Sequence, residues 1–331
     1  MKLARRRFVG GAIASFATPI PAGATVGPLM AGARIAPDRE EMIAVPGGRV
    51  YVRINGDLGG SKPPIIFIHG GPGSSHWYFL NATALADERA VILYDQLDSG
   101  RSDHPGDPKN WNVPRFVSEL DMIRASLGIE RLHVLGASWG GTVALEYASR
   151  HQPVVASVIL QSPLISTPKW LSDARVLKDR MPPKERRLLY ACETSDTPRK
   201  SDCDAATDAF YARHLSLVQP PPSVAAYKAS LPRSFSTDIY RYMWGDVEFT
   251  ATGTLKDYDG TPLLKRLDGR RTLFVAGEFD EAIPTTVERS AHSVPSATFR
   301  EIRHAAHTVM NDNPAAYLSV LRPWLNMHDR V

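Results

Sequence analysis

The chain has 331 residues, of which 43% are hydrophobic and 22% are charged, and 39 lysine and arginine residues against 35 aspartate and glutamate residues give it a net charge of +4. This is the composition of an ordinary globular protein, and the length suits one large α/β core with an inserted segment. No apolar run is long enough to cross a bilayer, so we do not expect a membrane-embedded protein.

The first 33 residues differ in kind from the rest of the chain. Arg5-Arg6-Arg7-Phe8-Val9 fits the twin-arginine export pattern, and a weakly apolar stretch rich in glycine and alanine follows it. Ala22-Gly23-Ala24 offers a cleavage site, and Ala31-Gly32-Ala33 offers a second. We therefore predict an export leader and linker over residues 1–33 and a periplasmic or secreted protein. The alternative is a basic tail on a cytoplasmic enzyme.

The distribution of charge agrees with a leader. Cleavage after Ala24 would remove four basic residues and no acidic one, which leaves 35 of each sign. The mature protein would then carry no bulk charge to attract nucleic acid or an anionic membrane, and we expect neither as a partner.

The two cysteines, Cys192 and Cys203, have no neighbouring histidines with the spacing of a zinc site. In an oxidising compartment they could close a short loop as a disulfide, whereas in the cytoplasm they would be two unrelated thiols.

The next segments predict strands that alternate with helices. A hairpin is expected over 42–55 around Pro46-Gly47-Gly48, and apolar strands over 64–68 and 90–94. Apolar residues at helical spacing over 116–127, between Pro114 and Gly128, predict a helix. This alternation is typical of a parallel, doubly wound sheet.

The central motif of the chain is Gly136-Ala137-Ser138-Trp139-Gly140. It follows an apolar strand over 132–135 directly, and a helical pattern begins at Thr142. A serine between a strand and a helix, with small neighbours that permit a strained turn, predicts the nucleophile elbow of an α/β-hydrolase.

After a strand at 154–160 the rhythm changes. Residues 165–259 contain no convincing buried strand, but they contain helical runs at 184–190, 205–217, 224–231 and 238–244, divided by prolines. A strand at 271–277, another near 297–302 and a helix from Asn313-Pro314 then resume the core pattern. We predict a core of 34–164 and 260–331 with a helical cap of 165–259 over the sheet's carboxyl edge.

A serine nucleophile needs a base and an acid, which in this fold follow it on later loops. The loop after the 271–277 strand holds Glu278, Asp280 and Glu281, and the loop after the last strand holds His304 and His307. The residue pattern by itself chooses within neither set.

Four segments together resemble the proline iminopeptidase family of the α/β-hydrolases, especially its tricorn-interacting aminopeptidase factors and the related amino-acid amidases. They are His69-Gly70-Gly71-Pro72-Gly73, Asp95-Gln96, Gly136 to Gly141, and Gly277-Glu278-Phe279-Asp280-Glu281. The likeness spans about Met42 to Trp324, and the five-residue His-Gly-Gly-Pro-Gly run is far more specific than the elbow. The sequence departs from the family at Leu97-Asp98, where an aromatic residue or arginine and then glycine are common.

The resemblance implies a role for each candidate. Ser138 becomes the nucleophile, Asp280 the acid and His307 the base, with His304 a surface neighbour. The amides of Gly71 and Trp139 would form the oxyanion hole. His69 would hold its loop. The resemblance also matches Glu248 and Glu281 to the carboxylates that bind the substrate's α-ammonium, one residue's length from the scissile carbonyl.

We therefore predict a serine aminopeptidase that releases an N-terminal residue, proline being the expected one, from a small peptide or amide, without a metal or cofactor. An amino-acid amide hydrolase with the same triad is the first alternative, and a carboxylesterase or lactonase is a weaker one because of the paired glutamates. A further alternative is a ligand-binding protein without catalytic activity on the same fold. We disfavour it, because such a protein would not need an intact triad. The sequence predicts neither the preferred first residue nor the oligomeric state.

Overall fold

The computed structural model describes residues 25–195 and 197–329. The twin-arginine motif and the residues of the first predicted cleavage site, Ala22-Gly23-Ala24, lie outside this part of the chain.

In the described residues, eight strands form one sheet in the order β1-β2-β4-β3-β5-β6-β7-β8. The strands β1 to β4 are Arg39–Val45, Gly48–Asn55, Ile65–Ile68 and Val91–Tyr94, and β5 to β8 are Leu132–Ala137, Val155–Gln161, Thr272–Gly277 and Thr298–Ile302. β1 pairs with β2 and β2 with β4 in antiparallel fashion, and the remaining neighbours are parallel. The mostly parallel α/β sheet that the sequence predicts is confirmed.

Helices cover both faces of the sheet. α1 (Val113–Ser126), α2 (Trp139–Ala148) and α8 (Pro284–His292) bury apolar residues in one core. The 3₁₀ helix η1 (His76–Asp87), α9 (Val309–Asp312) and α10 (Pro314–Met327) do so in a second core on the opposite face. The short 3₁₀ turns are η2 (Pro108–Asn110), η3 (Gln152–Val154), η4 (Thr261–Arg266) and η5 (Gly269–Arg271). Of the described helices, none is both long and apolar enough to span a bilayer.

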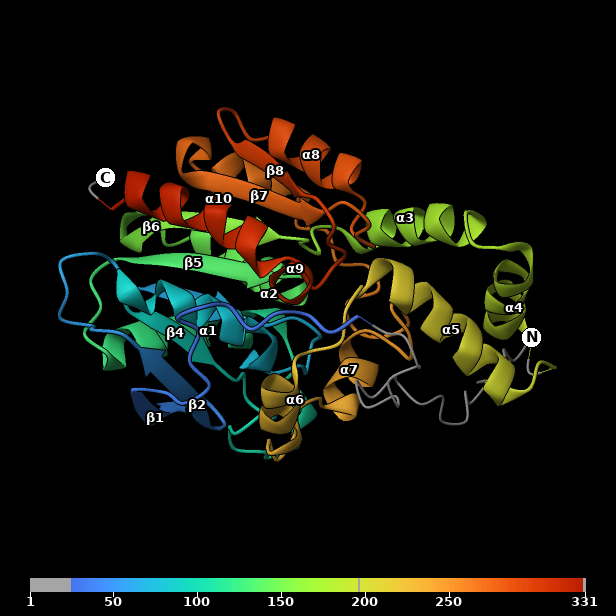
Figure 1. Cartoon of the computed structure of the whole chain (residues 1–331), viewed down its shortest axis with the longest axis horizontal. Helices are drawn as coiled ribbons and strands as arrows, with labels where there is room; N and C mark the ends of the chain where they lie inside the picture. The colour runs from blue at the N-terminus through green and yellow to red at the C-terminus, as the bar shows by residue number, and fades with distance from the viewer. Residues whose placement is uncertain (1–24, 196, 330–331) are drawn as a thin grey trace.

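Five helices stand between β6 and β7, where the sequence predicts a cap. They are α3 (Thr167–Asp179), α4 (Pro183–Thr194), α5 (Lys200–His214), α6 (Pro222–Ala229) and α7 (Thr237–Met243). Figure 1 places α3, α4, α5 and α7 together beyond one end of the sheet. α3, α4, α5 and Phe249 share a small apolar core of their own, which supports a separate cap. Its boundaries at 165 and 259 stay predictions.

A disulfide between Cys192 and Cys203 joins α4 to α5 within this group of helices. Of the two alternatives for the cysteines, the structure therefore contains the bonded pair.

Apart from the short 3₁₀ turns, four of the described helices were absent from the sequence predictions: α3, α8, α9 and η1. α3 begins after Ser166 with Pro168 in its first turn, and it buries Trp170, Ala174 and Leu177 at steps of four and three residues, a signal that could have been used. η1 is buried along most of its length, so its sequence has no polar face to reveal a helical period.

The segment 25–35 crosses from the cap to the core. Val26 forms a parallel bridge with Gln219, in the connection between α5 and α6. Asn81 of η1 accepts the amide of Met30 at 2.9 Å and donates to the carbonyl oxygen of Pro28 at 3.1 Å. We call residues 25–33 the N-terminal strap.

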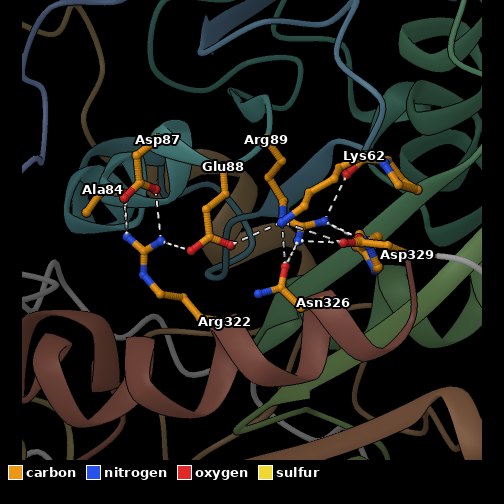
Figure 2. Close-up of polar contacts among 10 residues, drawn as sticks. Lys62, Ala84, Asp87, Glu88, Arg89, Arg322, Asn326 and Asp329 are labelled. Carbon is orange, nitrogen blue, oxygen red and sulfur yellow. Dashed lines mark hydrogen bonds and ion pairs between the residues drawn. The ribbon is translucent and has the colours of Figure 1, made fainter.

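The opposite end of the chain is held by ion pairs (Figure 2). Arg89, which follows η1, contacts both carboxylate oxygens of Asp329, at 2.5 and 3.2 Å, and Asn326 of α10 at 2.8 Å. Arg322, also on α10, binds Asp87 and Glu88 at the end of η1. Charged groups at the end of η1 thus fix the closing helix to the core.

Candidate active site

Ser138 occupies a strained turn between β5 and α2. Its backbone has φ 57° and ψ −122°, a region that side chains rarely adopt. The turn is closed so tightly that a Cβ on Gly136 would lie 2.0 Å from the oxygen of Gly140, and a Cβ on Gly140 would lie 2.1 Å from the oxygen of Ile68. Only glycine fits at either position. The tight turn holds Ser138 at the end of β5 and at the N-terminus of α2, whose positive end can stabilise a developing negative charge.

Of the three acids after β7, Asp280 is the one that forms a hydrogen bond with the imidazole of His307. Its Oδ1 lies 2.8 Å from Nδ1 of His307 and accepts the amide of Ala282 at 2.9 Å. Its Oδ2 accepts the hydroxyl of Ser162 at 2.5 Å and the amide of Gly277 at 3.0 Å. Four donors thus fix a carboxylate that is 1% exposed. No feature of the sequence pattern identified Ser162 beforehand.

His307 is buried, whereas His304 is exposed, with its backbone amide bound to Glu278 at 2.9 Å. Burial alone would lower the pKa of His307, but the carboxylates of Asp280, Glu281 and Glu248 outweigh it and raise the pKa to about 9. With Nδ1 bound to Asp280, Nε2 is the nitrogen left to exchange a proton.

The C-terminal end of cap helix α5 holds both loops of the site. The carbonyl oxygen of His214 accepts the backbone amides of Glu281 at 3.1 Å and of His307 at 3.2 Å. Leu215 accepts the amide of Thr308 at 2.9 Å. Sequence reasoning missed His214 and Leu215, because their role depends on how the cap docks and not on a local pattern.

The expected oxyanion loop is fixed by buried polar groups. Gly71 lines the same pocket as Ser138. Nε2 of His69 accepts the amide of Gln96 at 3.0 Å, and Gln96 accepts from the indole of Trp139 at 2.9 Å. Burial lowers the pKa of His69 to about 4, so the ring is neutral and its Nδ1 donates to the oxygen of Gly70 at 3.0 Å. His69 therefore ties the glycine loop to the elbow helix.

Glu248, between α7 and β7, and Glu281, in the loop after β7, both lie close enough to His307 to raise its pKa. Burial raises the pKa of Glu248, against a hydrogen bond from Tyr240 and the positive charge of His307. Burial and then repulsion from Glu248 raise the pKa of Glu281 well above its usual range, while His307 opposes this. Glu248 is fixed through its backbone, whose oxygen accepts the indole of Trp170 at 3.1 Å and whose amide donates to Tyr211 at 3.3 Å.

A pocket of about 530 Å³, counting its open mouth, lies over Ser138. Ser138, Glu248 and His307 supply its reactive and charged groups. Trp77, Tyr78, Leu215 and Phe235 supply most of its apolar wall. None of these four was predicted, since aromatic and leucine side chains in a sequence more often belong to a core.

The departure from the family pattern at Asp98 has a structural explanation. Asp98 adopts φ 67°, a conformation that glycine reaches more easily. Its carboxylate compensates by accepting the indole of Trp111 at 2.9 Å and the amide of Gly106 at 2.8 Å. These two hydrogen bonds help Asp98 to hold the left-handed conformation that glycine would adopt more easily.

Known proteins match this chain in both sequence and fold. The sequence model of the alpha/beta hydrolase fold matches residues 63–314. The proline iminopeptidase of Heyndrickxia coagulans is 38% identical over 87% of this chain and 98% of its own length. That of Levilactobacillus brevis is 35% identical over 88% of this chain and 98% of its own length.

The crystal structure of the proline iminopeptidase of Mycobacterium smegmatis superposes with a TM-score of 0.79 at 31% identity, covering 88% of this chain and 99% of that one. The likeness therefore includes the region of the cap as well as the sheet.

Proposed function

The chain belongs to the proline iminopeptidase family of the α/β-hydrolases, and on that premise we propose that it is a serine aminopeptidase that releases an N-terminal proline through an acyl-enzyme. The observation that carries the proposal is the pocket over Ser138, which brings a nucleophile together with His307 and Glu248. Glu281 lies next to His307.

The reaction needs one base at Nε2 of His307. Ser138 Oγ attacks the carbonyl carbon of the first residue while its proton passes to Nε2, and the same proton then leaves with the amine of the departing peptide. A water molecule then attacks the acyl-enzyme in the same way: its proton passes to Nε2 and then to Ser138 Oγ as the acid product leaves. Asp280 keeps Nδ1 protonated and stabilises the imidazolium.

Two further pairs of residues are proposed to act on the substrate. The amides of Gly71 and Trp139 are proposed to bind the oxyanion, which is most strongly held in the transition state. Glu248 and Glu281 are proposed to bind the substrate's ammonium, so that the scissile carbonyl of the first residue, and not one further along the peptide, lies over Ser138.

The test compares prolyl-naphthylamide, its N-acetylated form and naphthyl acetate on wild type and Glu248→Gln. Removal of one partner of a buried charge pair costs about 3–5 kcal/mol, or about two to four orders of magnitude in kcat/KM. We expect this loss for the acetylated substrate with wild type and for prolyl-naphthylamide with Glu248→Gln, while naphthyl acetate is almost unaffected. Equal rates on free and acetylated substrates would replace the aminopeptidase by an esterase.

We also propose export of the protein by the twin-arginine route to the periplasm or medium. The motif Arg5-Arg6-Arg7-Phe8-Val9 supports it, and so does the Cys192–Cys203 disulfide, since such bonds persist in oxidising compartments. Arg5→Lys combined with Arg6→Lys should retain precursor in the cytoplasm, as measured by fractionation. Secretion of the double variant at the wild-type level would contradict the proposal.

A further inference from the structure

Glu281 faces the nitrogen of His307 that catalysis requires. Its Oε1 lies 3.7 Å from Nε2, the atom that must accept the proton of Ser138. The same Oε1 is buried, and among the described residues it has no hydrogen-bond partner. The side chain of Glu281 is 3% exposed, so water offers it little solvation. A buried carboxylate in this position is stabilised by a proton on Nε2.

The charges around Glu281 make His307 its counterion. Repulsion from Glu248 and Asp280 and burial all act against a negative charge on Glu281, and His307 is the group that acts in its favour. No lysine or arginine of the described residues contributes to this balance. The imidazolium and Glu281 therefore stabilise one another, and an imidazolium cannot serve as the base.

We propose that Glu281 controls the catalytic base: it pairs with the imidazolium at Nε2 of His307, and the substrate's ammonium releases that nitrogen for Ser138 by taking Glu281 as its own partner. The inference rests on the proposed function, because it requires an amine at Glu248 and Glu281. It adds a second role to the amine, which then activates the enzyme as well as anchoring the substrate.

In the resting pair that we propose, the proton is on Nε2 of His307 and Glu281 is ionised, because the imidazolium opposes the rise in the pKa of Glu281 that burial and Glu248 cause. Arrival of the ammonium places a second positive charge beside the imidazolium, so the proton leaves Nε2 for solvent and the total charge of the cluster is unchanged. Nε2 then holds a lone pair that accepts the proton of Ser138 Oγ during attack.

The other groups around His307 come from several elements. Asp280 holds Nδ1 at 2.8 Å, and the ring of Trp170 on α3 packs edge-on with centroids 5.6 Å apart. Four further titratable groups face this cluster. Tyr211 and His214 are on α5, Tyr240 is on α7, and Glu248 follows α7. Burial raises the pKa of both tyrosines well above the ordinary value and lowers that of His214, so all three are neutral.

The first experiment measures the rate at which a fluorophosphonate modifies Ser138 as a function of pH. The probe has no amine, and its reaction transfers the serine proton to Nε2 while fluoride leaves. In wild type the rate should rise with pH to a midpoint near 9, the pKa of His307. In Glu281→Gln the midpoint should fall, and the rate at pH 7 should rise about tenfold for each unit of that fall.

A matched control is available in the same loop. Glu278→Gln makes the same change of charge three residues from Glu281, but Glu278 binds the amide of the exposed His304. Its midpoint should stay at the wild-type value. Circular dichroism and thermal melting establish that each variant is folded.

The second experiment needs no substitution. Pyrrolidinium has the ring and charge of an N-terminal proline but no carbonyl, so it occupies the amine site without acylating Ser138. At a concentration that inhibits prolyl-naphthylamide turnover, it should move the wild-type midpoint with fluorophosphonate to lower pH. The midpoint is the readout because partial blocking of the probe changes only the plateau rate.

The inference is overturned if Glu281→Gln, once shown to be folded, keeps the wild-type midpoint, or if pyrrolidinium inhibits turnover and leaves the midpoint in place. Failure of the proposed function has a different signature. In that case pyrrolidinium does not inhibit, and free and acetylated prolyl substrates are cleaved equally well.

Discussion

The imidazole of His214 donates from Nδ1 to the carbonyl oxygen of Phe279 at 2.9 Å. This bond connects the last turn of cap helix α5 to the residue immediately before Asp280. The cap thus does more than cover the pocket, because it positions the loop that carries the acid of the proposed triad.

We expect His214→Ala to lower kcat and to change KM little, because it loosens Asp280 without altering the amine site. The loss of one hydrogen bond is worth about 1 kcal/mol, so kcat should fall about fivefold. His214→Asn keeps a donor near the position of Nδ1 and should restore most of the rate. Equal kinetics for the two variants would mean that the bond to Phe279 does not position Asp280.

The two histidines of the last loop should differ sharply in their effects. Ser138→Ala and His307→Ala should each reduce kcat by up to about a million-fold, because members of a triad act as a unit. His304→Ala should be mild, since its side chain is exposed. Single-turnover assays on folded protein measure all three, and equal losses for the two histidine variants would overturn the assignment.

The sequence predicted most of the fold because each core strand has a strong local signal. Pro64 to Ile68 is continuously apolar, and the structure buries every residue of β3 there. Ser138 was predictable in the same way, since it lies within a strand–turn–helix motif. The choice of Asp280 and His307 needed the resemblance, because neighbouring loop acids and histidines have identical local chemistry.

The remaining parts of the site depend on contacts between segments that are distant in the sequence. Ser162 supports Asp280 from 118 residues away, and nothing near Ser162 indicates this role. The same is true of His214, whose carbonyl oxygen joins two loops. Cap contacts are set by tertiary docking, which a local pattern cannot encode.

The ion pairs at the end of α10 (Figure 2) should contribute to stability at neutral pH. The side chain of Arg89 is 1% exposed and binds Asp329 and Asn326. Hydrogen bonds to a charged group are worth about 1.5–3 kcal/mol, so Arg89→Met should lower the free energy of unfolding by about that amount in urea titrations. Arg270→Met, which removes a surface ion pair with Asp268 that is 82% exposed on the arginine side, is the control and should cause no measurable change.

This contribution should disappear in acid. Burial would raise the pKa of Asp329, but hydrogen bonds from His133 and Arg89 outweigh it and hold the pKa well below the usual 3.8. The folded state therefore favours the carboxylate, and Asp329 stabilises the protein above pH 3.8 and progressively less as the pH falls below it. The difference between wild type and Arg89→Met should narrow over that range. A difference that stays constant down to the acid transition would assign the loss to packing.

The N-terminal strap distinguishes between the two predicted cleavage sites. A chain that begins at Thr25 keeps the strap, whereas one that begins at Arg34 loses it. Removal of residues 25–33 would delete the bonds of Thr25 and Gly27 to Gln219, at 2.9 and 2.8 Å, and would leave the side chain of Asn81, which is 3% exposed, without Met30 and Pro28.

We therefore expect the mature protein to begin at Thr25, as read by mass spectrometry of the exported protein. In urea titrations, a variant that starts at Arg34 should be less stable than one that starts at Thr25 by about 2–4 kcal/mol, from four hydrogen bonds worth about 1 kcal/mol each. Asn81→Ala provides a matched test. It should destabilise the longer chain more than the shorter one, because Asn81 binds the strap only when the strap is present. Equal effects in both chains would show that the strap lies on the core without stabilising it, and both cleavage sites would then be compatible with the fold.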